Sequence, residues 1–140
     1  MDANKNSNSQ FSGFDTFEGL PEAWGVAFKK GDMNAINPNI NDNRVAFIKG
    51  LFQNTFIPFT KTHDLNNERI RVIHLDADLY SSTLYILTSI APYLKKGDIL
   101  LFDEFNVPNH EFSAFQSFTQ AFYIKTNLLG AVNNYLQVAL

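Results

Sequence analysis

The sequence predicts an α/β domain built on a mostly parallel sheet that ends in an antiparallel hairpin. Short apolar segments alternate with segments of helical periodicity, a pattern typical of strand–helix–strand units. Two apolar segments, residues 71–75 and 99–102, end directly in acidic residues. Residues 126–140 indicate two strands around Asn133 and Asn134, a pair suited to a tight turn. A mostly parallel sheet with one antiparallel strand accommodates all these observations.

The composition is that of a globular protein with a hydrophobic core. Of the 140 residues, 45% are hydrophobic and 18% are charged, and the formal net charge is −3. Lys and Arg form no cluster of the kind that nucleic acid or an anionic membrane requires, so we expect neither as a partner. The absence of cysteine excludes disulfides and thiolate metal sites. No apolar stretch approaches the ~20 residues of a membrane helix, and we expect a cytoplasmic protein.

The N-terminal part of the chain contains a polar lead-in and two predicted strands. Residues 1–10 are rich in Asn and Ser, and we expect them to be disordered, with the domain formed by residues 11–140. Residues 11–15 form a short apolar segment that ends in an acid, and residues 45–50 form a buried strand that ends in glycine.

Four helical segments are predicted between and after the strands. Pro21 is suited to open a short helix through about residue 30, and one helical turn is expected in residues 51–59 before Pro58. The segment from Ser81 to Gly97 carries one apolar helical face, formed by Leu84, Leu87, Ala91 and Leu94. A later segment carries one aromatic face, formed by Phe112, Phe115, Phe118 and Phe122. Both faces are expected to pack in the core.

Acidic side chains follow two of the predicted strands. Asp76 and Asp78 come after residues 71–75, and Asp103 and Glu104 come after residues 99–102. Ligands of open α/β sheets bind beyond the carboxyl ends of the strands, and two neighbouring parallel strands would bring these acids to one rim. Like charges at close range need a cation, a proton or wide spacing. This rim is the candidate site.

Four strings of residues appear in an informative order. They are GFDTFEGLP from Gly13, FIKGLF from Phe47, HLDADLYSST from His74 and FDE from Phe102. Together they closely resemble the macrocin O-methyltransferase-like (TylF-type) family of class I S-adenosylmethionine-dependent methyltransferases. The resemblance runs from about Phe11 to the C-terminus. It implies a Rossmann-like seven-stranded sheet, S-adenosyl-L-methionine as methyl donor, and a divalent metal between the acids after the fourth and fifth strands.

The resemblance assigns roles to residues near the early strands and near the acidic rim. Asp15 matches the acid that hydrogen-bonds the ribose of the methyl donor, and the turn with Gly50, Phe52 and Gln53 is expected to flank the adenine. Trp24 could line the donor pocket, although simple packing explains it as well.

At the rim, the resemblance implies that Asp76, Asp103 and Glu104 bind Mg²⁺ or another divalent cation, where the family more often shows Asp-Asp for the last two. Asp78 lies close by in the sequence. We expect it to form hydrogen bonds with the groups that surround the metal, or to act with Asp76 in catalysis. His110 could accept a proton, although a surface histidine is the commoner interpretation. The implied reaction is methyl transfer to a hydroxyl oxygen of a sugar or another small molecule.

One departure from the family concerns the donor loop. Class I methyltransferases carry a glycine-rich loop after the first strand, and no G-x-G occurs among the seven glycines here. The sequence begins where the second strand of the family would begin. We therefore expect the C-terminal part of a methyltransferase without its first strand, which needs a missing N-terminal segment or a homo-oligomer as partner. Alone, this part would bind the donor weakly or not at all.

Two other functional classes remain open at this point. Asp-x-Asp also holds a metal on the diphosphate in nucleotide-sugar glycosyltransferases, but the second acidic strand end and the GFDTFEGLP turn disfavour that reading. The other alternative is a non-catalytic methyltransferase remnant or split half that binds a partner.

Overall fold

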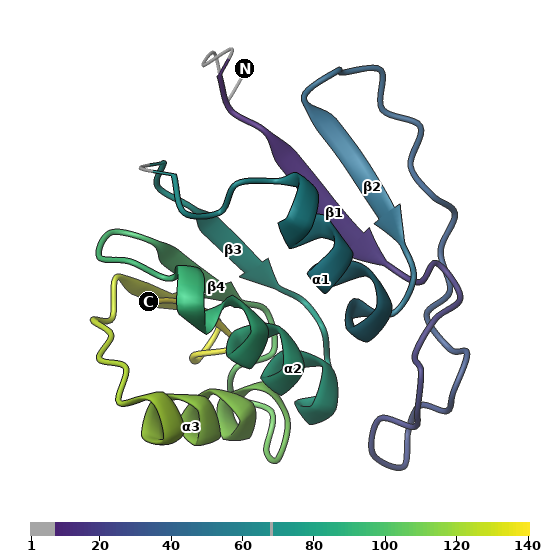
Figure 1. Ribbon diagram of the computed structural model, residues 1–140. Coiled ribbons are helices and arrows are strands. Elements are labelled where there is room, and N and C mark those ends of the chain that lie inside the picture. Colours follow the sequence, from purple (N-terminus) through teal and green to yellow (C-terminus); the bar gives the residue numbers. More distant parts are fainter. Residues whose placement is uncertain (1–7, 68) are drawn as a thin grey trace. The chain divides into compact units, whose positions relative to one another are not determined.

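The computed structural model describes residues 8–67 and 69–140, and the chain divides into two compact units, Met1–Pro58 and Phe59–Leu140. Each unit contains its own β-sheet (Figure 1). Most of the predicted lead-in, residues 1–7, lies outside the described residues. None of the helices in the described ranges has the length and hydrophobicity that crossing a bilayer requires.

The first unit contains a two-stranded parallel sheet. β1 (Phe11–Asp15) pairs with β2 (Val45–Lys49), so both strand predictions are confirmed. Gly13 lies opposite Phe47, and a Cβ at Gly13 would come within 2.8 Å of the Phe47 ring. The aromatic ring therefore occupies the space that a larger residue would need.

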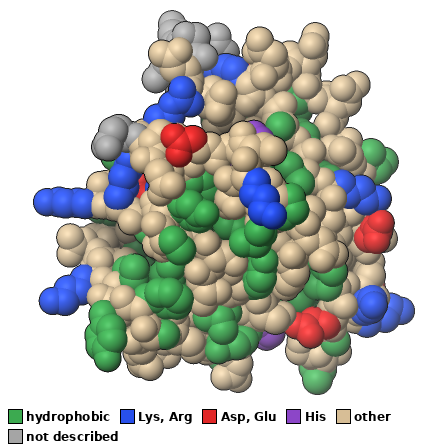
Figure 2. Space-filling view, in the orientation of Figure 1, with side chains coloured by type: hydrophobic (Ala, Val, Ile, Leu, Met, Phe, Trp, Pro, Cys, Tyr) green, Lys and Arg blue, Asp and Glu red, His purple; other side chains and the backbone are tan. Residues whose placement is uncertain are grey.

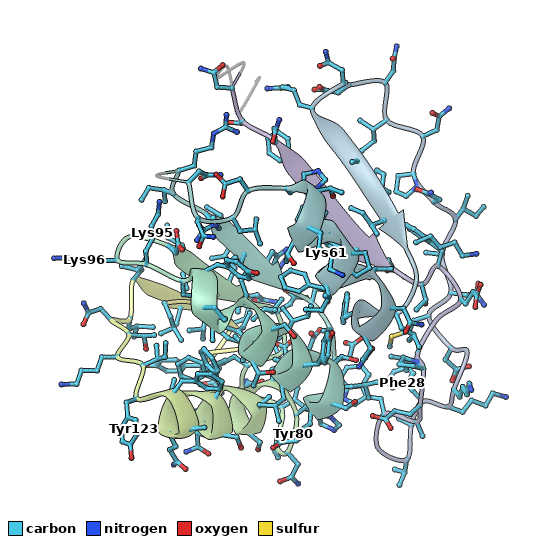
Figure 3. The ribbon with its side chains drawn as sticks, viewed as in Figure 1. Phe28, Lys61, Tyr80, Lys95, Lys96 and Tyr123 are labelled. Atoms are coloured by element: carbon cyan, nitrogen blue, oxygen red, sulfur yellow. The ribbon has the colours of Figure 1, made fainter. Side chains whose placement is uncertain are left out.

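The connection between these strands folds differently from the predicted helix over residues 21–30. Trp24 and Phe28 form an isolated antiparallel bridge, in which the Trp24 N–H donates to the Phe28 carbonyl at 3.1 Å. Their rings stack with centroids 5.1 Å apart, and Figure 3 labels Phe28. Gly25, with φ of 59°, supplies the left-handed backbone of this turn. The helix prediction was wrong because ring stacking and a glycine turn close a tight loop here.

α1 (Phe52–Thr62) is longer than the single helical turn predicted before Pro58. Pro58 lies inside the helix, where its missing N–H removes one helical hydrogen bond. Phe56 is buried, and its ring lies 6.0 Å from that of Phe14. The packing of Phe56 explains why a proline does not end the helix. The boundary between the two units falls within α1.

The second unit contains a four-stranded sheet with the strand order β3-β4-β6-β5. β3 (Val72–Leu75) and β4 (Ile99–Phe102) are parallel, whereas β6 (Gln137–Ala139) is antiparallel to β4 and to β5 (Gly130–Val132). The residues at 133–134 adopt positive φ angles of 50° and 55°, as the turn of the closing hairpin requires. The predicted parallel pair and C-terminal antiparallel hairpin are both confirmed.

Two helices of the second unit run side by side in Figure 1. α2 (Tyr80–Ile90), which continues into the 3-10 helix η1 (Ala91–Tyr93), packs against α3 (Glu111–Phe122). Tyr80, labelled in Figure 3, donates its hydroxyl hydrogen bond to Ser117 of α3 at 3.2 Å. The core of the unit lies among these helices and the central strands.

The buried faces of both helices differ in part from the predicted faces. In α2, Leu87 is fully buried as predicted, but Leu84 is only half-buried. The buried residues of α2 are Ser82, Thr83, Ile86, Leu87 and Ile90. In α3, Phe118 is fully buried, whereas Phe112 and Phe122 are 41% and 45% exposed. Polar residues occupy core positions on both helices, and this shifts the register that an apolar pattern alone predicts.

The surface carries dispersed charge and scattered hydrophobic side chains. On the face drawn in Figure 2, the Lys and Arg side chains are spread over the view, with several near one another at the upper left, and hydrophobic side chains reach the surface between them. Ile36 and Tyr123, for example, are 93% and 91% exposed.

Candidate functional site

The parallel pairing of β3 and β4 brings two acidic loops to the same edge of the second unit's sheet. Leu75 and Phe102, the last residues of the two strands, are register partners. The N–H of Asp103 donates to the carbonyl of Leu75 at 3.2 Å, so the pairing continues into the loops. The predicted adjacency of the two acid-ending strands is confirmed, and their acidic residues share one rim.

Three acids at this rim lie close enough together to bind one cation. Asp76, Asp78 and Glu104 each offer a carboxylate oxygen, and these oxygens lie within 4.8 Å of one another. Asp76 is exposed, and the other two are half-buried. The group differs in one member from the sequence-predicted set, since Asp78 takes the place of Asp103.

The local backbone explains why Asp78 joins this group. Asp78 adopts a left-handed φ of 56°, and the N–H of Leu79 donates to the carbonyl of Ala77 at 2.5 Å. A tight turn over residues 77–79 therefore forms between β3 and α2, with Asp78 at its centre and Asp76 directly before it. Asp and Asn adopt such left-handed conformations more readily than most residues. That the group binds a metal stays a prediction.

Burial and neighbouring negative charge raise the pKa values of two acids at this rim. Burial, and then the charges of Asp78, Asp103 and Asp76, raises the pKa of Glu104 to about 7. The pKa of Asp78 is also raised, first by burial and then by the charges of Asp76 and Asp103, whereas His110 lowers it. Without a cation the rim therefore favours bound protons.

One carboxylate oxygen of Glu104 is a buried, unsatisfied hydrogen-bond acceptor. Glu104 Oε2 is buried and has no hydrogen-bond partner among the described residues. Leaving a buried acceptor unsatisfied costs about 1 to 3 kcal/mol. An unsatisfied oxygen beside two other carboxylates is the chemistry expected of a position that receives a cation or a proton.

Glu111 also belongs to this site, although the sequence analysis did not identify it. It is the first residue of α3, and its side chain is fully buried. Its Oε1 accepts the N–H of Ala77 at 3.3 Å, and its Oε2 accepts the N–H of Glu104 at 3.2 Å. Burial raises the pKa of Glu111 to about 7, against the opposing effect of these two hydrogen bonds.

The sequence did contain a signal for Glu111. It precedes Ala114, Phe115 and Phe118 by three, four and seven residues, the spacing of one helical face. An acid on an apolar face is seldom fully buried unless other groups satisfy it. Its place among aromatic residues was therefore informative.

His110 lies at the N-terminal end of α3, next to Glu111. It is half-buried, its carbonyl accepts the N–H of Ala114 at 3.0 Å, and its charge acts on Asp78. It is thus near the acidic rim, and its role as proton acceptor stays a prediction.

The predicted donor-binding residues all belong to the first unit. The N–H of Gly50 donates to the carbonyl of Asp15 at 2.9 Å, so the ends of β1 and β2 are joined. Asp15 Oδ1 accepts the N–H of Phe17 at 2.6 Å, and the side chain is exposed. Phe52 and Gln53 open α1. The structure brings Asp15 and Gly50 together, and donor binding by the four residues stays a prediction.

A side chain at position 50 would be unfavourable, so glycine is needed there. Its φ is 139°, and a Cβ there would come within 2.9 Å of a Thr55 methyl group. Trp24, the other residue considered for the donor pocket, stacks on Phe28 in its own loop.

Comparison with protein families and solved structures gives consistent matches. Residues 34–135 match the family model of Macrocin-O-methyltransferase (TylF). CalS11, a calicheamicin methyltransferase, has a TM-score of 0.72 at 21% sequence identity, and the O-methyltransferase NovP has a TM-score of 0.68 at 19% identity. Both matches cover 94% of this chain. A search of curated proteins found no match.

A further structure of CalS11, described as a TDP-rhamnose 3'-O-methyltransferase, has a TM-score of 0.55 at 25% identity. This match covers 69% of the present chain and 42% of CalS11. In the two matches with higher TM-scores, the chain spans 59% of the length of CalS11 and of NovP. The shared fold is that of Rossmann-like methyltransferases.

Proposed function

The chain belongs to the macrocin-O-methyltransferase (TylF) family. We propose that it takes part in methyl transfer from S-adenosylmethionine to a hydroxyl oxygen of a sugar or a similar small molecule. The observation that carries the proposal is the group formed by Asp76, Asp78 and Glu104 at the ends of two parallel strands. The description of CalS11 as a TDP-rhamnose methyltransferase supports a sugar hydroxyl as the acceptor.

The acidic group fits a divalent cation by two criteria. Its donors are carboxylate oxygens, which Mg²⁺ and other hard cations prefer. The buried, unsatisfied Oε2 of Glu104 and the raised pKa values of Asp78 and Glu104 indicate negative charge that lacks compensation. Asp76, Asp78 and Glu104 would hold the ion, and Asp103 adds negative charge beside them. A bound cation supplies the means to lower the pKa of a substrate hydroxyl.

The chain's own residues would divide the remaining tasks. Asp15 offers an exposed carboxylate to a ribose hydroxyl, and the turn at Gly50 allows close approach of the backbone to the adenine. His110, beside the acidic rim, would accept the proton that the hydroxyl loses. The hydroxyl oxygen would form a bond to the methyl carbon while the bond between the sulfonium sulfur and the methyl group breaks. The products are a methyl ether, the thioether left from the donor, and a proton.

Calorimetric titration with Mn²⁺ tests the cation site. We expect the wild type to bind one ion, Asp76→Asn to lose binding, and Asp64→Asn, which changes an exposed acid of the same unit, to bind normally. Asp103→Asn separates the structural group from the sequence-predicted one. Loss of binding in Asp103→Asn with normal binding in Asp78→Asn would favour the latter, and equal binding by the wild type and Asp76→Asn would reject the site.

Titration with labelled S-adenosylmethionine, with and without Mg²⁺, tests the activity, and TDP-rhamnose serves as the first acceptor. Donor binding and methyl transfer would support the proposal. Mn²⁺ binding without donor binding would instead favour the non-catalytic or partner-dependent form of the protein. The sequence contains no G-x-G motif, which makes the measurement of donor binding the more informative of the two.

A further inference from the structure

Glu111 is the buried acid that the proposed chemistry leaves without a task. Its side chain is 0% exposed, although a glutamate is seldom fully buried without compensation. The salt bridges among the described residues do not include Glu111. Its compensation comes instead from two backbone N–H groups that belong to the acidic loops.

The two oxygens of Glu111 reach two different loops. Oε1 accepts the N–H of Ala77, the residue between Asp76 and Asp78 in the loop after β3. Oε2 accepts the N–H of Glu104 itself, in the loop after β4. One carboxylate thus bridges the two backbone segments from which all three proposed ligands project.

The peptide groups around Ala77 have little freedom. The N–H of Ala77 is held by Glu111 at 3.3 Å, and its carbonyl accepts the N–H of Leu79 at 2.5 Å. Asp78 follows with a left-handed φ of 56°. Two hydrogen bonds thus hold the backbone of Ala77, which lies between Asp76 and Asp78.

The helix that carries Glu111 is firmly placed within the second unit. Ala114 and Phe118, on the same face of α3, are fully buried, and α3 packs against α2. Neither oxygen of Glu111 belongs to the group of three that could share an ion. Glu111 therefore contacts the backbone of the loops that carry the proposed metal ligands, and is not one of the ligands itself.

We propose that Glu111 is a positioning residue that fixes the spacing of the two acidic loops, so that Asp76, Asp78 and Glu104 can bind one divalent cation together. The inference rests on the proposed function of this rim. Residues that orient metal ligands typically contribute about 10- to 100-fold to metal affinity. A glutamine at this position keeps the size but has one oxygen, so it can accept only one of the two N–H groups.

The test measures Mn²⁺ affinity by calorimetry, and thermal unfolding in EDTA, for the wild type and Glu111→Gln. We expect Glu111→Gln to weaken Mn²⁺ binding by about 10- to 100-fold. Leu87→Ala is the matched control, because it removes buried atoms from α2 and changes no residue of either acidic loop. It should lower the unfolding temperature and leave the Mn²⁺ affinity within about twofold, so that loss of stability and loss of positioning are separated.

Glu111→Asp provides a second variant that keeps both acceptor oxygens on a shorter side chain. Partial recovery of affinity relative to Glu111→Gln would support positioning through the two hydrogen bonds. Wild-type affinity in a folded Glu111→Gln variant would overturn the inference. Failure of both variants to fold would also overturn it, because Glu111 would then be a requirement of the fold itself. Absence of Mn²⁺ binding in the wild type would instead reject the proposed metal site.

Discussion

The two units of the chain differ in how much of their structure is buried. Of the twelve buried hydrophobic residues in the described part of the chain, ten belong to the second unit, and only Leu20 and Phe56 belong to the first. The second unit has four strands and two packed helices, whereas the sheet of the first has two strands. Isolated two-stranded sheets are marginally stable. The acidic rim belongs to the second unit, which has the larger core.

One ion pair from each unit shows the same difference. In the second unit, Arg71 and Asp98 pair at 2.7 Å with side chains only 13% and 3% exposed. In the first unit, Lys49 and Glu18 pair at 3.0 Å with side chains 58% and 74% exposed. Buried pairs are costly to break and exposed pairs contribute little. The comparison implies that removing the acid should have unequal effects at these two pairs.

The largest effect is expected at Asp98. Its carboxylate accepts hydrogen bonds from the N–H groups of Arg71 and Lys95 as well as from the Arg71 guanidinium. Asp98→Ala would leave the largely buried Arg71 cation without its carboxylate partner, and we expect a loss of about 3 to 5 kcal/mol in the free energy of unfolding. Urea denaturation measures it. A loss below about 1 kcal/mol, the range of exposed pairs, would remove this difference between the units.

A slightly smaller effect is expected at Leu87, which is fully buried in α2. Leu87→Ala removes methyl groups from a packed core and should cost about 2 to 5 kcal/mol. Val26→Ala in the first unit is the matched control, since Val26 is fully exposed and its truncation should change stability by less than about 0.5 kcal/mol. Denaturation curves that shifted equally for both variants would contradict the burial difference.

A pH dependence should follow from the acidic rim. In the folded state the pKa of Glu104 is raised from 4.5 to about 7, so the folded state binds its proton more tightly than the unfolded state does. The metal-free protein should therefore lose stability as pH rises from about 4.5 to about 7, where the unfolded state binds fewer protons. Glu104→Gln cannot ionise and should show a shallower decline. Urea midpoints in EDTA across this range would test it, and parallel declines would contradict it.

Much of the second unit could be predicted because its signals are local. Apolar runs that end in acids predicted β3 and β4, and the Asn pair predicted the hairpin at 133–134. The helix faces were only partly right because Thr83 and Glu111 occupy core positions. Glu111 is satisfied by the backbone N–H groups of Ala77 and Glu104, which belong to other segments of the chain, and apolar periodicity does not reveal such partners.

The candidate site shows the same limit. The rim could be predicted from the strand ends, but the choice between Asp78 and Asp103 depends on a left-handed turn that the residue pattern does not specify. In the first unit, stacking of Trp24 on Phe28 replaced the predicted helix, and burial of Phe56 carried α1 through Pro58. Each miss reflects packing that outweighed a local preference.

The smallest effect is expected at Glu18 in the first unit, where the comparison is sharpest. Its partner Lys49 ends β2, and both side chains are largely exposed to water that screens their attraction. Glu18→Ala should therefore change the free energy of unfolding by no more than about 0 to 1 kcal/mol, and the change should shrink in high salt. Urea denaturation at low and high salt, in parallel with Asp98→Ala, provides the measurement. A loss at Glu18 as large as that at Asp98 would mean that the first unit derives from this exposed pair the stability that its small core does not supply.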